Sequence, residues 1–266
     1  INDITNKKSA IMHQSNKQFS WVDEDINILI PMAGHGSRFV DAGYTFPKPL
    51  IEVFGKPMIQ LVVENLSIKG NYTYVIQKQH QIKYNIKSML KILTPNCNFV
   101  EVDSVTEGAA CTTLLAKEYI NNDKPLIICN SDQYVEMNVA NIMYKFSNKE
   151  VDGGILVFNS IHPKWSYAKT NEKNIVTEVA EKRAISNKAT CGIYFWKKGI
   201  EYVKYAEQMI QKNIRVNNEF YVCPVFNEAI LDKKIFITEN VENMWGIGTP
   251  EDLNYFINNF EKKNNS

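Results

Sequence analysis

The chain has 266 residues, 44% of them hydrophobic, and its 30 basic and 29 acidic residues give a formal net charge of +1. A chain of this length and composition can bury the core of one large domain without disulfides or a structural metal. The near-zero charge excludes a global field that draws the protein to nucleic acid or membranes, so any affinity for phosphate must be local.

The five cysteines lie far apart, without C-x-x-C spacing, and each stands in an apolar stretch. This pattern favours reduced core thiols and a cytoplasmic protein. No run approaches the roughly 20 apolar residues that a membrane span needs. We therefore expect neither a membrane nor nucleic acid among the partners.

Residues 1–25 are rich in Asn, Lys, Ser and Gln and begin with Ile1, which predicts a flexible tail, a linker or the edge of a longer polypeptide. From residue 26 to about 262, short β-rich runs alternate with helical periodicity, as is typical of one layered α/β domain. In residues 26–135 we predict strands at 26–31, 72–77, 98–102 and 125–130, and helices near 57–67, 79–93 and 109–119. They should form a Rossmann-like sheet, mixed but mostly parallel and flanked by helices.

In residues 150–250, four β-like runs follow one another with little helix between them, which predicts a small β-rich extension of the sheet. These runs cover residues 153–158, 167–169, 175–181 and 189–196. Helices at about 200–212 and 219–231, a strand at 234–238 and a final helix from Pro250 are predicted to follow. Because open α/β sheets bind ligands at the carboxyl ends of their strands, the loops that start at Pro31, Gln77, Asp103 and Asn130 should meet at one cleft.

The loop after the first strand reads Pro31-Met-Ala-Gly-His-Gly-Ser-Arg38. Gly34 and Gly36 allow its peptide N–H groups to face an anion, and Arg38 adds a bidentate phosphate donor. A G-x-G after a strand is a weak signal by itself, and a tight turn explains it equally well. Phe39 replaces the third glycine of the dinucleotide fingerprint, and the Lys-Ser/Thr ending of a P-loop is absent.

Lys48 stands between two prolines, Pro47 and Pro49. Because proline restricts the backbone, this lysine can be held over a phosphate cluster, although a solvated loop lysine is the alternative. A known signature resembles the start of this chain: a first strand, the G-x-G-x-R loop, the K-P-L at 48–50 and the G-K-P-M at 55–58. It is the amino-terminal signature of the sugar-phosphate nucleotidyltransferases, also called nucleotide-sugar pyrophosphorylases.

The resemblance continues in order to about residue 260, through the segments 105–114, 126–132, 178–182 with 189–194, 218–221 and 245–252. It implies an enzyme in which an acceptor phosphate oxygen attacks the α-phosphorus of an NTP and pyrophosphate leaves. The implied acceptor is a sugar phosphate or polyol phosphate. The implied product is an activated sugar or polyol for surface polysaccharide synthesis.

The resemblance also implies roles for individual residues. Arg38 and Lys48 would stabilise charge on the NTP phosphates and the leaving pyrophosphate, and Lys182 would neutralise the acceptor phosphate. Asp132, at the end of a strand, is the candidate Mg²⁺ ligand, with a turn or helix-capping role as the alternative. The other residues expected at the nucleotide, mostly in loops that follow strands, are Met32, Ala33, Gly34, Gly36, Ser37, Gln77, Thr106, Glu107, Gly108 and Ser131.

The acceptor is expected to lie against residues of the second half, namely Tyr167, Glu181, Gly192 and Glu219. Two departures from the family pattern concern this half. The family often has an acidic metal ligand two positions before the glycine of its late G-T, where this chain has Gly246, with Glu242 or Asp252 as weak substitutes. The familiar E-K-P reads E-K-R here, so that Arg183 follows Lys182 and the acceptor is expected to differ from an ordinary hexose 1-phosphate.

The small residues Ala109 and Ala110 indicate a narrow base pocket. The resemblance implies a pyrimidine base, with CTP slightly ahead of UTP, and a capsule-type cytidylyltransferase of a bacterial envelope pathway. The sequence leaves the acceptor and a homo-oligomeric state open. One rival is a metal-dependent glycosyltransferase of the related fold, in which residues 130–132 would be a reduced D-x-D motif. A second rival is a catalytically inactive nucleotide-binding module, which the glycine at 246 favours.

Overall fold

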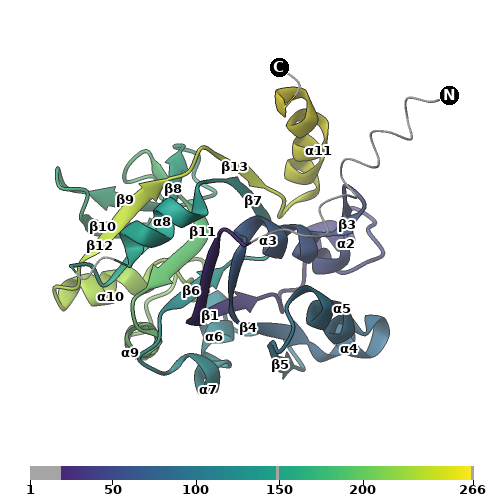
Figure 1. Ribbon diagram of the computed structural model, residues 1–266, viewed down its shortest axis with the longest axis horizontal. Helices are drawn as coiled ribbons and strands as arrows, with labels where there is room; N and C mark the ends of the chain where they lie inside the picture. Colours follow the sequence, from purple (N-terminus) through teal and green to yellow (C-terminus); the bar gives the residue numbers. More distant parts are fainter. Residues whose placement is uncertain (1–18, 148–149, 265–266) are drawn as a thin grey trace.

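The computed structural model describes residues 19–147 and 150–264. Within them a nine-stranded sheet runs in the order β10-β9-β11-β6-β1-β4-β5, with β8 between β11 and β12 (Figure 1). The parallel core consists of β1 (Trp21–Pro31), β4 (Ile68–Gln77), β5 (Asn98–Val102) and β6 (Leu126–Cys129). The α/β class and the mostly parallel central sheet predicted from the sequence are confirmed.

The remaining strands extend this core on the β6 side. Strand β11 (Lys188–Trp196) is antiparallel to β6 and to β8 (Gly153–Asn159), and β12 (Phe236–Asn240) is parallel to β8. The hairpin of β9 (Ser166–Thr170) and β10 (Val176–Glu181) joins the start of β11. Two short ribbons lie apart from this sheet: β7 (Gln133–Glu136) with β13 (Asn243–Gly246), and β2 (Glu52–Val53) with β3 (Lys56–Pro57).

Helices cover both faces of the sheet because successive side chains of the central strands point to opposite sides. In β1, Ile28 and Ile30 belong to one hydrophobic cluster and Leu29 to the other. The first cluster contains α3 (Met58–Leu66), α5 (Ile86–Leu93), α8 (Val139–Phe146) and α11 (Pro250–Asn264). The second contains α6 (Ala109–Leu114), α7 (Lys117–Ile120), α9 (Gly199–Gln211) and α10 (Val225–Leu231).

Several element boundaries differ from the sequence prediction. The strand predicted at 72–77 begins at Ile68, the helix predicted at 109–119 is divided into α6 and α7, and the strand predicted at 234–238 is β12. Strand β1 begins at Trp21, which pairs with Ile68, so residues 21–25 of the expected tail lie in a strand, and residues 1–18 lie outside the described residues. The helix predicted at 79–93 is divided into α4 (Lys78–Tyr84) and α5 because Asn85 adopts a left-handed conformation, φ 50°. The helix predicted at 219–231 begins at Val225, after Pro224. A proline disfavours helical geometry in the residue that precedes it.

Short elements near the site were missed because they are too short for a periodic signal. They are α2 (Ser37–Asp41), the 3-10 turn η1 (Lys48–Leu50) and the ribbon of β7 and β13. Among the described residues, no helix combines the length and the apolar character needed to cross a membrane.

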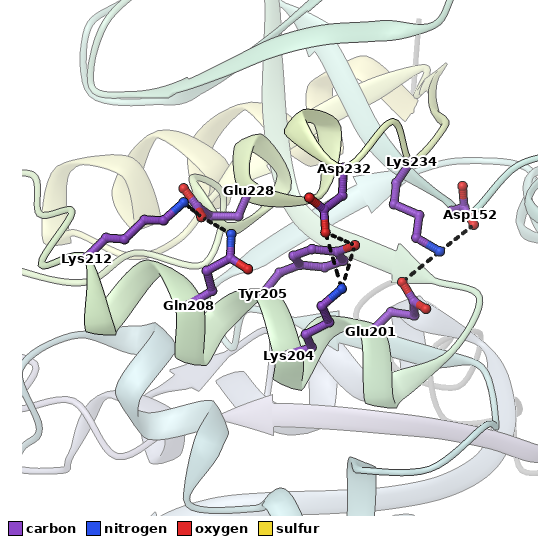
Figure 2. Close-up of polar contacts among 9 residues, drawn as sticks. All are labelled: Asp152, Glu201, Lys204, Tyr205, Gln208, Lys212, Glu228, Asp232 and Lys234. Carbon is purple, nitrogen blue, oxygen red and sulfur yellow. Dashed lines mark hydrogen bonds and ion pairs between the residues drawn. The ribbon is translucent and has the colours of Figure 1, made fainter.

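Polar contacts fix α10 on α9 (Figure 2). The Glu228 carboxylate, whose side chain is 3% exposed, accepts hydrogen bonds from Lys212 at 2.6 Å and from Gln208 at 2.5 Å. Asp232, at the end of α10, pairs with Lys204 and accepts a hydrogen bond from Tyr205. These contacts matter for the site because the loop 219–224, which leads into α10, lines the main cavity.

Lys212→Met is expected to lower the free energy of unfolding by on the order of 1–3 kcal/mol, because it leaves the buried Glu228 carboxylate without its cation. Chemical denaturation measures this loss. Lys117→Met is the matched control, since its partner Glu207 is half exposed, and should cost less than about 1 kcal/mol. Equal losses in the two variants would contradict the assigned burial of Glu228.

Candidate active site

A cavity of about 410 Å³ lies at the carboxyl ends of β1 and β6. The loops after these two strands line it, together with residues 105–112, the start of β9 and the middle of β11. The loop 219–223 and the segment from β13 to the start of α11 complete the lining. The expected convergence is therefore found for the loops that start at Pro31, Asp103 and Asn130.

The cavity opens where β6 ends while β11 continues. Ile193 still pairs with Cys129 of β6, but Ala189 pairs with Tyr167 of β9. Between them Gly192 has φ 74° and its carbonyl accepts a hydrogen bond from the Asn130 amide at 2.8 Å. A Cβ at Gly192 would lie 2.3 Å from Asn130 Nδ2. Only glycine therefore allows the backbone of β11 to pass this close to Asn130.

Five residues of the first loop line the cavity: Pro31, Met32, Ala33, Gly34 and Arg38. Gly36 and Ser37 do not line it, and instead begin the short helix α2 that carries Arg38. Gln77 does not line it either. Its side-chain amide donates to the carbonyls of Ala33 and Gly34 at 2.9 and 3.1 Å, so it holds the loop where the sequence suggested a base contact.

Lys48 and Asp132 meet in the cavity. Lys48 Nζ lies 2.8 Å from Asp132 Oδ2, and the two side chains are 21% and 29% exposed. The carboxylate packs on Gly248, where a Cβ would lie 2.6 Å from Oδ2. The neighbouring Ser131 is buried and also lines the cavity.

The segment expected to hold the base is fixed by its own hydrogen bonds. Thr106 donates to the Gly108 carbonyl at 2.9 Å, and a Cβ at Gly108 would lie 2.4 Å from the Phe220 carbonyl oxygen. Thr106 and Gly108 line the cavity. Glu107 does not, because it is exposed and its carboxylate pairs with Arg215 at 2.5 Å.

On the acceptor side, Glu181, Gly192 and Glu219 line the cavity. Burial raises the pKa of the Glu181 carboxyl, against the opposing effects of a hydrogen bond from Ser166 and the charge of Lys182. The Glu219 carboxylate accepts a hydrogen bond from Tyr221 at 2.5 Å. This side therefore offers carboxylate and hydroxyl oxygens, which suits a ligand with hydroxyl groups.

Lys182 does not line the cavity but contacts Tyr221, which does. Its Nζ donates to the Tyr221 hydroxyl at 2.6 Å and lies 4.7 Å from the centre of that ring. Tyr221 itself lines the cavity. Lys182 must therefore leave this contact to reach a phosphate in the cavity.

Tyr167 is misplaced by the sequence prediction. It is fully buried and donates to the His162 carbonyl, whereas its neighbour Ser166 lines the cavity. Since side chains alternate along a strand, the prediction chose the wrong face of β9. Trp165 and Tyr221 were also missed as lining residues. Tyr221 belongs to the segment 218–221, which the resemblance includes.

A divalent cation would find few protein ligands here. Among the described residues, no group of three or more His, Cys, Asp and Glu side chains could hold a metal ion. Mg²⁺ often takes only one or two carboxylates plus substrate phosphates, and Asp132 meets that need. Of the two substitutes suggested for the missing acid, Glu242 is exposed and outside the lining, whereas Asp252 lines the cavity with Oδ2 3.7 Å from the Cβ position of Gly246.

The chain is similar in sequence to a family of known proteins and to individual members of it. A family model described as nucleotidyl transferase matches residues 28–259. A mannose-1-phosphate guanylyltransferase catalytic subunit beta of Dictyostelium discoideum is 23% identical over 88% of this chain and 66% of its own length. A mannose-1-phosphate guanyltransferase of Schizosaccharomyces pombe is 25% identical over 84% of this chain. The chain spans 61% of that second relative's length.

Solved structures share the fold. A nucleoside-diphosphate-sugar pyrophosphorylase from Vibrio cholerae RC9 superposes with a TM-score of 0.75 at 22% identity, over 87% of this chain and 99% of that one. A UDP-glucose pyrophosphorylase complexed with UDP-glucose gives a TM-score of 0.71 at 18% identity, over 89% of this chain and 98% of that one.

Glu181→Gln is expected to raise the free energy of unfolding at neutral pH, because the buried carboxylate is disfavoured in the folded state while the amide keeps the Ser166 contact. The pKa of Glu181 is higher in the folded than in the unfolded state. Its destabilising effect is therefore absent below the unfolded-state pKa and grows as the pH rises from that pKa through the folded-state pKa. Denaturation of both proteins across pH measures the difference. A gain that persists at low pH would refute this origin, and Glu207→Gln, at a half-exposed site, serves as control.

Proposed function

The chain belongs to the nucleotidyl transferase family, and on that basis we propose that it couples an NTP to a sugar phosphate or polyol phosphate. An oxygen of the acceptor phosphate attacks the α-phosphorus of the NTP, and the bond from that phosphorus to the β-phosphate oxygen breaks. The products are pyrophosphate and an activated NDP-sugar or NDP-polyol.

One observation carries the proposal: two sets of residues assigned to different substrates line the same cavity. Arg38, Lys48 and Asp132, which are assigned to the NTP, line it, and so do Glu181 and Glu219, which are assigned to the acceptor. The distance between reactants is a main determinant of rate when two bound groups must react. A cavity shared by both sets supports transfer between two substrates.

The charges fit a triphosphate. Arg38 and Lys48 stabilise negative charge on the NTP phosphates and on the leaving pyrophosphate. Asp132 would hold Mg²⁺ together with the phosphates, and Mg²⁺ would neutralise part of their charge. Ala33 and Gly34 supply backbone N–H groups to the phosphates, and Ser131 stands beside them. Met32 lines the cavity, but its N–H donates to the Val75 carbonyl at 3.0 Å. Gly36, Ser37 and Gln77 act indirectly, by shaping and holding this loop.

For the acceptor we propose hydroxyl contacts with Glu181 and Glu219, and a close backbone approach at Gly192. Lys182 would move from Tyr221 to the acceptor phosphate. Tyr167 has no place among these contacts, because its hydroxyl is already bound to His162. Ser166 and Tyr221 take the position that was expected of it.

For the base we propose the segment with Thr106 and Gly108, and a pyrimidine, with CTP slightly ahead of UTP. Ala109 lines the cavity beside this segment. GTP is the second candidate, because the relatives reported above are named guanylyltransferases. We propose a cytoplasmic role in capsule or envelope polysaccharide synthesis, as the resemblance implies.

The glycosyltransferase alternative is less favoured by the geometry. The side chain of Asn130, which would be the first ligand of a reduced D-x-D motif, packs against Gly192. Arg38 and Lys48 both line the cavity, and two cations there suit a triphosphate and a leaving pyrophosphate. The inactive-module alternative rests on Gly246. It loses force because Asp132 and Asp252 both remain in the cavity lining.

The test is pyrophosphate release from four NTPs against a panel of sugar, polyol and amino-alcohol phosphates. We expect release with one pyrimidine NTP above the others. Asp132→Asn and Lys48→Ala should each lower kcat on the order of 10²–10³-fold, since each removes a charge placed at the phosphates. Lys145→Ala, whose partner Glu239 stands outside the cavity lining, should leave turnover unchanged.

Two results would defeat the proposal. One is the absence of pyrophosphate with every pair of substrates. The other is transfer of a sugar from an NDP-sugar, or hydrolysis of that NDP-sugar, which would favour the glycosyltransferase.

A further inference from the structure

A cation in the cavity lining is left without a role by the proposed reaction. Lys164 lies in the segment 160–165 between β8 and β9 and lines the cavity. Its Nζ contacts both carboxylate oxygens of Asp252, at 2.8 and 3.1 Å. The same Nζ lies 4.6 Å from the centre of the Trp165 ring.

The indole of Trp165 is a fixed support for this lysine. Its Cη2 lies 3.0 Å from the position of a Cβ on Gly246, so a larger residue there would displace the ring. Phe158 contacts it edge to face at 5.4 Å. The glycine that replaces an acidic residue therefore makes room for an aromatic ring, with a cation above it.

The backbone joins this support to the acceptor side. The Lys182 amide donates to the Trp165 carbonyl at 3.0 Å. The adjacent Ser166 hydroxyl donates to Glu181. Lys164 is therefore tied through the backbone of Trp165 and Ser166 to the residues expected at the acceptor.

The contact between Lys164 and Asp252 is of a kind that a ligand can displace. The two side chains are 40% and 28% exposed, and an ion pair of this exposure contributes only about 0–1 kcal/mol to stability. A phosphate offers more charge and more acceptor oxygens than one carboxylate. The exchange of a carboxylate for a phosphate can therefore be favourable.

We propose that Lys164 binds the phosphate of the acceptor, and that Asp252 holds this lysine until the phosphate displaces it. This inference rests on the proposed function for the identity of the acceptor. It adds to Lys182 a second cation on the acceptor side, drawn from another loop. It also gives Asp252 a role as a positioning residue that competes with the ligand.

Competition predicts effects of opposite sign in two variants. Using isothermal titration of the full chain with inorganic phosphate as the probe, Lys164→Ala should weaken binding by about tenfold. Asp252→Asn should strengthen it by about threefold, because the competing carboxylate is gone. In the Lys164→Ala background, Asp252→Asn should give a smaller gain, as a double-mutant cycle measures.

Matched controls distinguish a specific effect of Lys164 and Asp252 on phosphate binding from a general effect of changed net charge. Lys145→Ala and Glu239→Gln alter an ion pair whose two residues lie outside the cavity lining and should leave phosphate binding unchanged. Lys164→Gln and Lys164→Arg are additional variants, of which the arginine should restore most of the binding. Thermal unfolding verifies that each variant is folded.

The inference is overturned if Asp252→Asn weakens binding as Lys164→Ala does, or if neither variant changes it. With an acceptor found by pyrophosphate release, Lys164→Ala should raise the KM of the acceptor and leave that of the NTP unchanged. A raised KM for the NTP alone would also overturn it. Because phosphate binding needs no turnover, opposite effects without any transferase activity would reject the proposed function and keep the phosphate site.

Discussion

Strand β11 is longer than its neighbour β6, nine residues against four, and the cavity depends on this difference. Where β6 ends, β11 continues and takes β9 as its partner. Gly192 makes the transition possible, because its backbone approaches Asn130 more closely than any side chain would permit. The loop that carries Asp132 therefore faces the hairpin that carries Glu181.

The charges of the cavity suit the two phosphorylated substrates of the proposed reaction. The cavity is lined by Arg38, Lys48 and Lys164, with Lys182 behind Tyr221. Two of these cations, Lys48 and Lys164, are paired with aspartates. Such pairs keep the charges close to neutral in the free protein while holding both cations and carboxylates ready for phosphates and a divalent cation.

Much of this could be predicted from the sequence because the signals are local. Alternating short strands and helices indicated the α/β sheet, and the rule that ligands bind at the carboxyl ends of strands placed Asp132 correctly in the cavity lining. Tyr167 was misplaced because the face of β9 on which it lies depends on the strand register, in which Tyr167 pairs with Ala180 and Ala189. The pairing of Lys164 with Asp252 could not be predicted from the sequence, since 88 residues separate them and only the fold brings them together.

The proposed function requires one cavity to hold the triphosphate at the loop 31–38 and the acceptor at Glu181 and Glu219. A crystal structure with Mg²⁺ and a non-hydrolysable NTP tests it most directly. The account predicts the triphosphate beside Arg38 and Lys48, the cation on Asp132, and open space toward Glu181 and Lys164. A nucleotide bound outside this cavity, or one whose phosphates lie against Glu181 and Glu219, would contradict it.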